Sequence, residues 1–432
     1  MFNVKKKEYL YKKDYEAPVR DLLPKEFEPD YGITKVNYWT PPEVSRYEDL
    51  EYYRFCVDQC IKCACCRLVA REWDRICPSG ELGAFESYYA SGKNLLIWGL
   101  LRDEIELTEE IAKIFYHCTL CGNCTQQCAV PHIHGNMVYW FEAFREKAVA
   151  MGIGPLPEHK EQAVNIDAEH NPYGEPHTRR LDWLPFSVED LPDKAEIVFF
   201  AGCTDSYLEK RAAQSMVEIL KKAGVDFTIS KDERCCGMPL QRTGQTAEAK
   251  ERATYVVEDL HRLQPKIVVT NCAGCYRMLK EDYPNRYGMK LNFEVVPSAS
   301  LVLDLIEKGN IKLKKNGINK ITYHDPCELG RLKGVYESPR EVLAKIPGVE
   351  LIEMKRNREN AWCCGGGGGV MAAFPQLAAF SSTKRIEEAM ATGAEAVVSH
   401  CPACERNLRA ATVRAKVKMQ VLSLVEMVAK AV

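Results

Sequence analysis

One cysteine pattern occurs twice in the C-terminal half of this 432-residue chain. Each copy has a single cysteine, then an adjacent pair followed by glycine, and then a Cys-x-x-Cys motif. The intervening stretches are 31 and 35 residues in the first copy and 35 and 36 in the second. This repeated order predicts a duplicated iron–sulfur module. The first five-cysteine set is Cys203, Cys235, Cys236, Cys272 and Cys275, and the second is Cys327, Cys363, Cys364, Cys401 and Cys404.

Two further cysteine runs lie nearer the N-terminus and resemble the runs of bacterial ferredoxins. In such a run three thiolates of one loop bind one cubane [4Fe-4S] cluster, and the fourth cysteine binds the other cluster of a pair. Ten residues separate the third and fourth cysteines of the earlier run, which indicates a looped-out insertion. We therefore predict two cubane clusters, one bound by Cys60, Cys63, Cys66 and Cys128 and the other by Cys77, Cys118, Cys121 and Cys124. Cys56 and Cys65 remain as a buried thiol and a neighbour of the loop, with Cys65 an alternative ligand to Cys66.

The chain has 20 cysteines and no apolar segment at its N-terminus that resembles a secretory signal. We therefore expect a cytoplasmic protein, in which thiols bind metal rather than form disulfides. Zinc competes for Cys-x-x-Cys motifs, but it explains neither the adjacent cysteine pairs nor the ferredoxin runs. A net charge of −2 without a long basic block disfavours a nucleic-acid partner, and no apolar run approaches the length of a membrane span.

The N-terminal half predicts a helical ferredoxin domain between two less regular segments. Residues 81–117 carry an apolar stripe at helical spacing, and Thr108 before two glutamates is typical of a helix start. Residues 151–194 contain six prolines and little periodicity, so we expect a surface linker there. Residues 1–54 predict either a solvated tail or an extension that docks a partner, because aromatic residues anchor interfaces. The aromatic residues in question are Tyr38, Trp39, Tyr47, Tyr52 and Tyr53.

The C-terminal half predicts two α/β domains, over residues 195–310 and 311–432, that follow the helical domain of residues 55–150. Short apolar strands precede the cysteines, so the cysteines are expected at the carboxyl ends of mostly parallel sheets, where open α/β sheets place their sites. A helix with an apolar face is expected to stop at Gly224. The expected strands are 197–200, 225–229, 267–269, 321–323, 349–354 and 396–398. The predicted fold class is α+α/β, with an internal duplication about a pseudo-two-fold axis.

This pattern resembles the cysteine-rich CCG domain of heterodisulfide reductases, and the resemblance covers nearly all of residues 55–432. Two ferredoxin motifs ahead of two CCG domains resemble the D-type catalytic subunit and the related subunits of the Dsr, Tmc and Hmc transmembrane redox complexes. The resemblance implies that each five-cysteine set can hold a noncubane [4Fe-4S] cluster, giving one or two in total. It also implies that these ten cysteines are catalytic and that paired clusters cleave a disulfide, each receiving one sulfur on iron.

The implied function is a subunit that passes electrons through the cubane clusters to the noncubane clusters and reduces a disulfide or oxidises a dithiol. The implied partners are an integral-membrane cytochrome b-type or quinone-facing subunit, a multihaem cytochrome c, and a small or protein disulfide or dithiol substrate. The chain would then lie on the cytoplasmic side, peripheral to the inner membrane, without flavin or NAD of its own. The alternative is an electron-relay subunit for a flavin dehydrogenase of the glycolate or glycerol-3-phosphate type.

A run of five glycines and two histidines adjoin the second five-cysteine set. Oligoglycine is often a flexible spacer, but beside cysteines it would let backbone N–H groups approach cluster sulfides and leave room for a substrate. The glycines proposed for cofactor binding are Gly365, Gly366 and Gly367. His324 and His400 are candidate proton donors for thiolate release, with packing roles as the alternative. His117 is expected to tune a cubane cluster.

Overall fold

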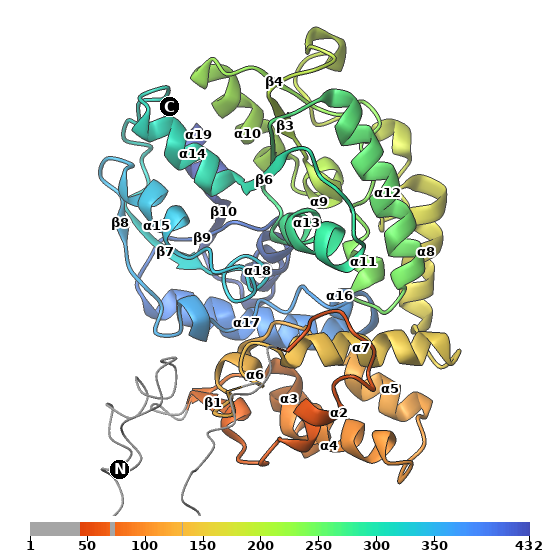
Figure 1. The fold of residues 1–432 in the computed structure, drawn as a ribbon. Helices are drawn as coiled ribbons and strands as arrows, with labels where there is room; N and C mark the ends of the chain where they lie inside the picture. Colours follow the sequence, from red (N-terminus) through yellow and green to blue (C-terminus); the bar gives the residue numbers. More distant parts are fainter. Residues whose placement is uncertain (1–43, 70–73, 132) are drawn as a thin grey trace, which may run out of the picture.

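The computed structural model describes residues 44–69, 74–131 and 133–432, and these form three parts (Figure 1). The predicted docking residues Tyr38 and Trp39 lie outside these ranges. A helical part, red to orange-yellow in Figure 1, lies below two α/β halves, of which the first is mainly green and the second mainly blue. Within the described residues, no helix is both long enough and apolar enough to cross a bilayer.

The helical part confirms the helices predicted over residues 81–117. Its helices are α2 (Arg54–Asp58), α3 (Pro78–Gly83), α4 (Ala90–Leu101), α5 (Glu109–Tyr116), α6 (Asn123–Gln126) and α7 (Met137–Ala150). Thr108 begins α5 as predicted, because its side chain accepts a hydrogen bond from the Ile111 N–H at 3.3 Å. The predicted insertion contains an antiparallel pair, β1 (Leu68–Val69) and β2 (Asp74–Arg75).

Each α/β half contains a four-stranded parallel sheet, and the two sheets share one strand order, as expected for a duplication. The order is β4-β3-β5-β6 in the first half and β8-β7-β9-β10 in the second. The strands are β3 (Ile197–Phe199), β4 (Phe227–Thr228), β5 (Ile267–Thr270), β6 (Glu294–Pro297), β7 (Lys320–His324), β8 (Glu350–Leu351), β9 (Ala396–Ser399) and β10 (Gln420–Ser423). Six of these were predicted. β6 and β10 were missed because each is marked by only two apolar residues.

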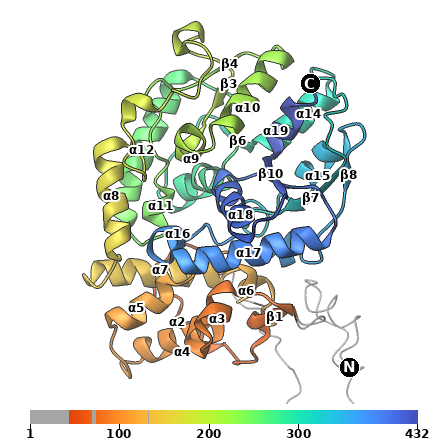
Figure 2. The ribbon, with the colours of Figure 1, turned by 180° about the vertical axis from the view of Figure 1, so that it is seen from behind.

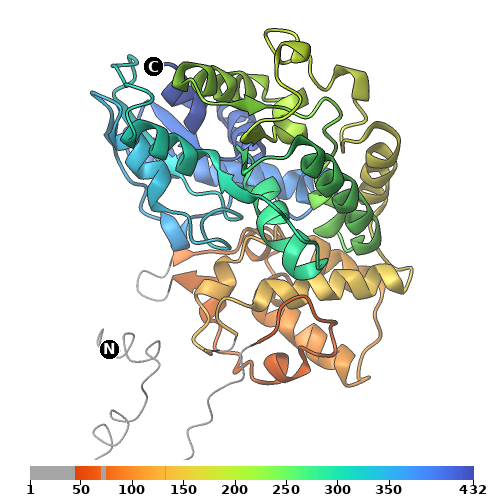
Figure 3. The same ribbon diagram turned by 45° about the horizontal axis from the view of Figure 1, so that its top comes forward.

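The helices of the two halves pack beside and between the sheets, which lie side by side in Figure 3. The first half contains α9 (Gly202–Tyr207), α10 (Lys210–Ala223), α11 (Met238–Gln241), α12 (Thr246–Leu263), α13 (Ala273–Arg277), the π-helix η5 (Met278–Arg286) and α14 (Ser298–Glu307). The second contains α15 (Glu337–Ala344), α16 (Val370–Ala373), α17 (Pro375–Ala391), α18 (Pro402–Ala415) and α19 (Leu424–Ala429). As predicted, α10 ends at Gly224, whose φ of +64° suits a residue without a Cβ. One buried apolar cluster contains Phe199 and Tyr323, so the halves share a core.

A pseudo-two-fold relation between the halves is visible in one thiol contact. Cys272 and Cys401 occupy the same place in the two copies of the cysteine pattern. The Cys272 and Cys401 thiols lie close enough for each to shift the pKa of the other. Equivalent residues that lie close together are expected near the axis that relates them.

The prediction of a surface linker over residues 151–194 is wrong. Residues Pro157–Glu169 form helix α8, with Pro157 at the first helical position, where its missing N–H costs nothing. Trp183 is 1% exposed and packs against Phe199 in the shared core. Arg180 is also buried. Prolines therefore mark helix and turn boundaries here, and the partners of the buried side chains are too distant in sequence to give a periodic pattern.

A buried ion network joins the helical part to both halves. Glu142 on α7 lies 3.1 Å from Arg277 of the first half, and Arg277 lies 2.9 Å from Glu328 of the second. Arg242 lies 2.7 Å from Asp282 and 3.3 Å from Glu142. Each of these five side chains is at most 9% exposed, so removing one partner would leave an uncompensated buried charge.

Arg145 on α7 forms a second joint at the same boundary, along which α7 and α17 run (Figures 1 and 2). Its Nη2 donates to the Phe115 and Cys118 carbonyls at 2.7 and 2.6 Å. Its Nη1 donates to the carbonyls of Arg242 in the first half and Gly368 in the second, at 2.5 and 2.8 Å. One buried guanidinium thus bonds all three parts of the chain.

The described end of the N-terminal extension packs on its own chain. Tyr53 is fully buried against Trp140, and the Tyr47 hydroxyl donates to Glu281 of the first half. Tyr52 is 44% exposed. Of the aromatic residues expected to dock a partner, two therefore anchor the extension intramolecularly and one faces outward.

Candidate iron–sulfur sites

The first predicted cubane set lines one small cavity. Cys60, Cys63, Cys66 and Cys128 face it together with Asn94 of α4. The Asn94 amide donates to the Cys60 sulfur at 3.7 Å and accepts from the Trp140 indole at 3.0 Å, which orients it. Cys65, the alternative ligand, does not line this cavity, and its thiol hydrogen-bonds Cys63. Cys56 is buried in the core of the helical part.

The second predicted cubane set, Cys77, Cys118, Cys121 and Cys124, lines a neighbouring cavity. The Gly80 N–H donates to the Cys77 sulfur at 3.4 Å. Lys93, which sequence reasoning missed, is buried here, and its ammonium feels the charges of Cys118 and Cys77. Burial lowers the pKa of Lys93. Because α4 also carries Asn94, adjacent residues of one helix give the two cavities different charges.

His117 lies at the edge of this second cavity. Its Nδ1 lies 3.2 Å from the Ser79 hydroxyl, and its ring packs against Phe374 of the second half. Burial and the nearby Lys93 lower the pKa of His117 to about 4. The imidazole is therefore neutral at pH 7.

All five cysteines of the first five-cysteine set line one cavity of about 140 Å³. The Cys236 and Cys275 sulfurs are 3.5 Å apart. Arg180, from the segment expected to be a linker, donates from both Nη atoms to the Cys203 sulfur at 3.7 Å. Its carboxylate partner is Glu233, at 2.7 Å, which also accepts the Ala201 and Gly202 N–H groups. Contact with Cys235 and burial raise the pKa of Cys203 well above its usual range, and the Arg180 guanidinium opposes this rise by favouring the thiolate.

Sulfur–sulfur contacts join the cysteines of the second five-cysteine set, as they join Cys236 and Cys275 in the first. The Cys364 and Cys404 sulfurs are 3.2 Å apart, Cys363 contacts Cys327, and Cys401 contacts Cys404. Four of its cysteines are at most 6% exposed: Cys363, Cys364, Cys401 and Cys404.

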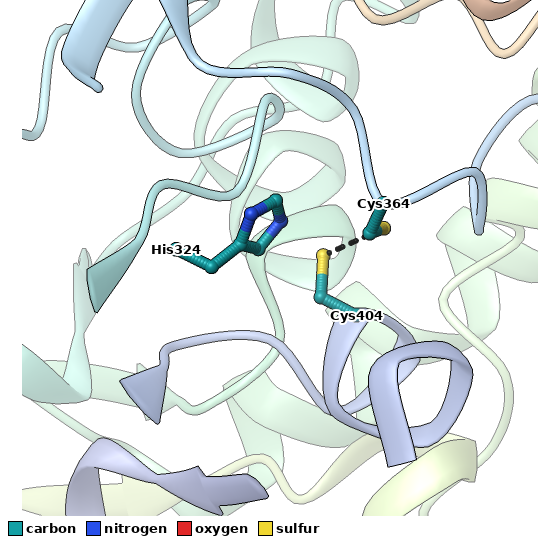
Figure 4. Close-up of side chains that lie close together, drawn as sticks. All are labelled: His324, Cys364 and Cys404. Carbon is teal, nitrogen blue, oxygen red and sulfur yellow. Dashed lines mark hydrogen bonds between the residues drawn. The ribbon is translucent and has the colours of Figure 1, made fainter. Parts of the chain in front are cut away.

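His324 reaches this second set from the end of β7, as Figure 4 shows. A ring nitrogen of His324 and the sulfurs of Cys364 and Cys404 lie within 4.8 Å of one another. Arg385 donates to His324 Nδ1 at 3.0 Å, so Nε2 carries the ring proton. Burial and Arg385 lower the pKa of His324 to about 3. The imidazole is thus a neutral N–H donor near the thiols.

His400 has a similar state but a different partner. Its Nε2 lies 2.6 Å from the Ser298 hydroxyl at the start of α14, and the side chain is 1% exposed. Burial lowers the pKa of His400 to about 4. His400 therefore links the two halves as a neutral side chain beside Cys401.

The glycine run passes between several of these sites. The Gly365 and Gly366 N–H groups donate to the Cys363 and Cys364 sulfurs, each at 3.3 Å, as expected for a backbone that approaches the cysteines. Residues 366–369 then line the cavity of the first five-cysteine set. A Cβ added at Gly368 would meet the Cys118 carbonyl at 2.5 Å. Only glycine fits this close crossing, so the run is not a flexible spacer.

The cysteines of neighbouring sites lie close enough to shift one another's pKa. Burial and neighbouring thiols, Cys66 of the first cubane set among them, raise the pKa of Cys124 in the second. Cys121 of the second cubane set and Cys363 of the second five-cysteine set shift each other's pKa. Cys272 and Cys401, from the two five-cysteine sets, do the same.

The donor atoms fit iron–sulfur clusters better than a single ion. Hydrogen bonds from Cys363 and Cys404 hold the pKa of the Cys364 thiol well below its usual range, and Cys235 and Cys275 do the same for Cys236. Buried thiolates need positive counter-charge, which metal supplies. Five sulfurs exceed the four ligands of a structural zinc site.

Two of the residues found at these sites, Arg180 and Lys93, were not predicted from the sequence. Arg180 and Lys93 carry no local signal, since one lies in a proline-rich segment and the other within an ordinary helix. A signal did exist for one pair: an arginine stands two positions after the last cysteine of each copy, at Arg277 and Arg406.

Comparison with known proteins identifies the domains. The cysteine-rich domain family matches residues 197–280 and again residues 321–409, and a 4Fe-4S dicluster domain matches residues 56–131. The D subunit of the dihydromethanophenazine:CoB--CoM heterodisulfide reductase of Methanosarcina mazei is 41% identical over 327 residues, covering 75% of this chain and 79% of that protein.

Two further relatives are more distant. The B subunit of the CoM/CoB fumarate reductase of Methanothermobacter marburgensis is 32% identical over 320 residues, covering 71% of this chain and 60% of that protein. The EtfAB:quinone oxidoreductase of Syntrophomonas wolfei is 29% identical over 352 residues, covering 75% of this chain and 46% of that protein. With its dicluster domain followed by two cysteine-rich domains, the chain is an iron–sulfur electron-transfer protein and belongs to the family of heterodisulfide reductase D subunits.

Proposed function

We propose that this protein delivers electrons to a disulfide, or withdraws them from a dithiol, in the cavity of the first five-cysteine set. The observation that carries the proposal is the cavity of about 140 Å³ that all five cysteines of this set line. Reduction of a disulfide consumes two electrons and two protons and yields two thiols. A path of neighbouring sites ending at an open cavity suits such a reaction.

The cysteine sets would hold two cubane [4Fe-4S] clusters and one noncubane [4Fe-4S] cluster in each five-cysteine set. When bound, these clusters would store and pass electrons singly and offer iron to a substrate sulfur. The order of contacts supports a path from the first cubane set through the second, then through Cys363, and finally across Cys401 to Cys272.

The residues around the first five-cysteine set would orient the reacting sulfur. Arg180 favours the thiolate form of Cys203 and keeps its charge partner Glu233 close. Met238 and Met371 give the cavity apolar walls that exclude water. Gly366 and Gly367 leave room where a side chain would fill the space.

The two histidines would hold hydrogen bonds rather than release protons. Both imidazoles are neutral at pH 7, because their pKa values are lowered to about 3 for His324 and about 4 for His400. A neutral imidazole N–H is a weak acid. We therefore assign His324 Nε2–H to stabilise the nearby sulfurs and His400 to position Cys401 through Ser298.

Electrons would enter at the first cubane set, which is farthest along the path from the cavity. Cys63 is exposed there, so a partner can approach its edge. We propose an integral-membrane cytochrome b-type or quinone-facing protein as that partner, with a multihaem cytochrome c as a further source of electrons. The name of the quinone oxidoreductase relative supports this class, and the chain would then lie peripheral to the membrane on its cytoplasmic face.

The second candidate function is electron relay alone, with the chemistry in a separate flavin protein. Burial of the adjacent cysteine pairs favours relay, because Cys235, Cys236, Cys363 and Cys364 are each at most 4% exposed. Relay alone does not explain the cavity beside the first set.

An EPR titration of anaerobic, oxidised protein with small thiols separates the two functions. If the cavity binds substrate sulfur, a new paramagnetic signal appears with thiol and is absent without it. If every thiol leaves only the signals of ordinary cubane clusters at all potentials, the relay function is correct and catalysis takes place in another protein of the complex.

A further inference from the structure

Arg406 of α18 lines the cavity of the first five-cysteine set. Among the described residues that line this cavity, and apart from the cysteine thiols, it is the single side chain with a formal charge. Its guanidinium lies over the ring of Tyr173, 5.4 Å from the centroid. In the part of the chain that the structure describes, Arg406 forms neither an ion pair nor a hydrogen bond. The nearby Glu209 feels its charge, but Glu209 is paired with Arg409. Arg406 thus brings a positive charge to a largely apolar cavity whose other titratable lining groups, among the described residues, are thiols and the Tyr173 hydroxyl.

The duplication shows that this charge is not a requirement of the cysteine motif. Arg277 occupies the equivalent position in the first half, two residues after Cys275, as Arg406 follows Cys404. Arg277 is fully buried and is neutralised by Glu142 and Glu328 at 3.1 and 2.9 Å. Arg277 is therefore part of the buried ion network that joins the helical part to both halves.

One equivalent position contributes to the difference between the two arginines. Glu328, a partner of Arg277, directly follows Cys327; the equivalent residue after Cys203 is Thr204. Thr204 lines the same cavity as Arg406, and its hydroxyl bonds the Tyr173 hydroxyl at 2.8 Å. Arg277 of the first half is thus paired with a carboxylate of the second half, whereas the equivalent position across from Arg406 holds a neutral hydroxyl of the first half. The guanidinium of Arg406 is therefore left for a ligand.

We infer that Arg406 binds an anionic group, a carboxylate, sulfonate or phosphate, on the thiol or disulfide whose sulfur enters the first five-cysteine set. This inference rests on the proposed function. A guanidinium presents paired N–H donors that match such groups, and Tyr173 holds it in place. The apolar walls suit the carbon chain between the anionic group and the sulfur. Arg406 is then a specificity-determining residue rather than a catalytic one.

The test compares three thiols of different charge by the EPR titration of oxidised protein. The probes are 3-mercaptopropionate, 2-mercaptoethanol and cysteamine, which are anionic, neutral and cationic. Arg406→Gln should raise the half-saturating concentration of the anionic thiol roughly tenfold, as expected for the loss of a charge-assisted contact. It should change the value for the neutral thiol much less and lower that for the cationic thiol. Each thiol is compared with itself between proteins, so differences in thiol acidity cancel.

Three controls keep the result specific. Arg414→Gln removes an arginine from the same helix that lies outside the cavity and bonds the Ser382 hydroxyl, and it should leave the charge preference as it is. Arg406→Lys retains the charge and should recover part of the preference. Thr204→Glu should supply Arg406 with the carboxylate that Arg277 already has and abolish the preference. Iron content and the cubane EPR signals report whether each variant is loaded.

The outcomes are distinguishable. Equal changes for all three thiols in Arg406→Gln would mean that Arg406 only offsets the negative charge of the thiolates, and the inference would be wrong. A thiol-dependent signal with no charge preference in the unmodified protein would also overturn it, while leaving the proposed function intact. The absence of any thiol-dependent signal would overturn the proposed function and this inference together.

Discussion

The two five-cysteine sets share spacing, strand order and helix order, yet they have different surroundings. The first set lines a cavity of about 140 Å³, and the second lies next to Cys121 of the helical part, which shifts the pKa of Cys363. Arg180, from the segment after α8, bonds the Cys203 sulfur of the first set. One ligand pattern therefore has two environments, in part because the two halves pack against different parts of the chain.

Electrostatics follow the same division. Arg277 forms ion pairs with carboxylates at the junction of the three parts. Its counterpart Arg406 faces the cavity and has no ion pair within the described chain. The exchange of Glu328 for Thr204 between equivalent positions contributes to the contrast. Duplication thus allowed one copy to become an internal joint and the other to become a binding site.

Replacing equivalent cysteines tests the comparison with the largest effect. Cys203→Ser should abolish the thiol-dependent EPR signal, because it removes a cysteine of the open site. Cys327→Ser should preserve that signal in chemically oxidised protein but reduce turnover with the physiological electron donor to background, because it breaks the path through Cys363. EPR and steady-state assays on the same samples measure both. If the two variants behave alike, the sets share one role.

Substituting the residues after those cysteines tests stability. Glu328→Gln should destabilise the protein by about 3 kcal/mol or more, because Arg277 would keep a buried charge without its full compensation. Thr204→Val should cost about 1 kcal/mol, the value of one hydrogen bond to Tyr173. Anaerobic denaturant unfolding of the loaded proteins gives both numbers. Similar losses in the two variants would contradict the assignment of Glu328 to the joint.

Two alanine substitutions in the glycine run sharpen the comparison further. Gly368→Ala should destabilise the protein by about 2 kcal/mol, because a left-handed φ of +63° and a Cβ 2.5 Å from the Cys118 carbonyl both oppose it. Gly366→Ala meets its nearest neighbours at 3.2 and 3.4 Å and should mainly narrow the first cavity, which weakens thiol binding a few-fold. Thermal unfolding and the EPR titration separate the two effects. A larger loss of stability for Gly366→Ala than for Gly368→Ala would contradict this assignment.

The smallest effect is expected upstream of both sets, at Lys93. Lys93→Met should lower the reduction potential of the cluster in the second cubane set by roughly 50 mV, since a nearby buried cation contributes on the order of 1 kcal/mol to the reduced state. The exposed Lys113 of α5 provides a matched control, and Lys113→Met should change the potential little. Redox titration followed by EPR measures both. An equal shift of all clusters would indicate a change in fold rather than in local charge.

Much of this architecture could be predicted from the sequence, because cysteine spacing and apolar strands are local signals. The structure gathers Cys60, Cys63, Cys66 and Cys128 around one cavity and Cys77, Cys118, Cys121 and Cys124 around another, as the ferredoxin spacing predicts. The burial of Trp183 and Arg180 could not be predicted in this way, because their partners lie in other parts of the chain.

The docking of the helical part was also beyond sequence reasoning. It depends on Glu142 meeting Arg277, residues 135 positions apart, and on carbonyl groups that have no sequence signature. The state of the histidines was also beyond sequence reasoning: proximity to cysteines suggested proton donors or packing residues, and burial lowers the pKa of His324 to about 3 and that of His400 to about 4. Sequence spacing predicts which residues lie close together, but it does not predict how deeply they are buried or how burial shifts their pKa values.

Arg145 has a consequence for the biogenesis of this protein. Its four hydrogen bonds go to the carbonyls of Phe115, Cys118, Arg242 and Gly368, which belong to all three parts of the chain. We therefore expect cluster insertion at the Cys118 loop to be coupled to closure of the three parts. Cells short of iron should then accumulate an open, protease-sensitive chain.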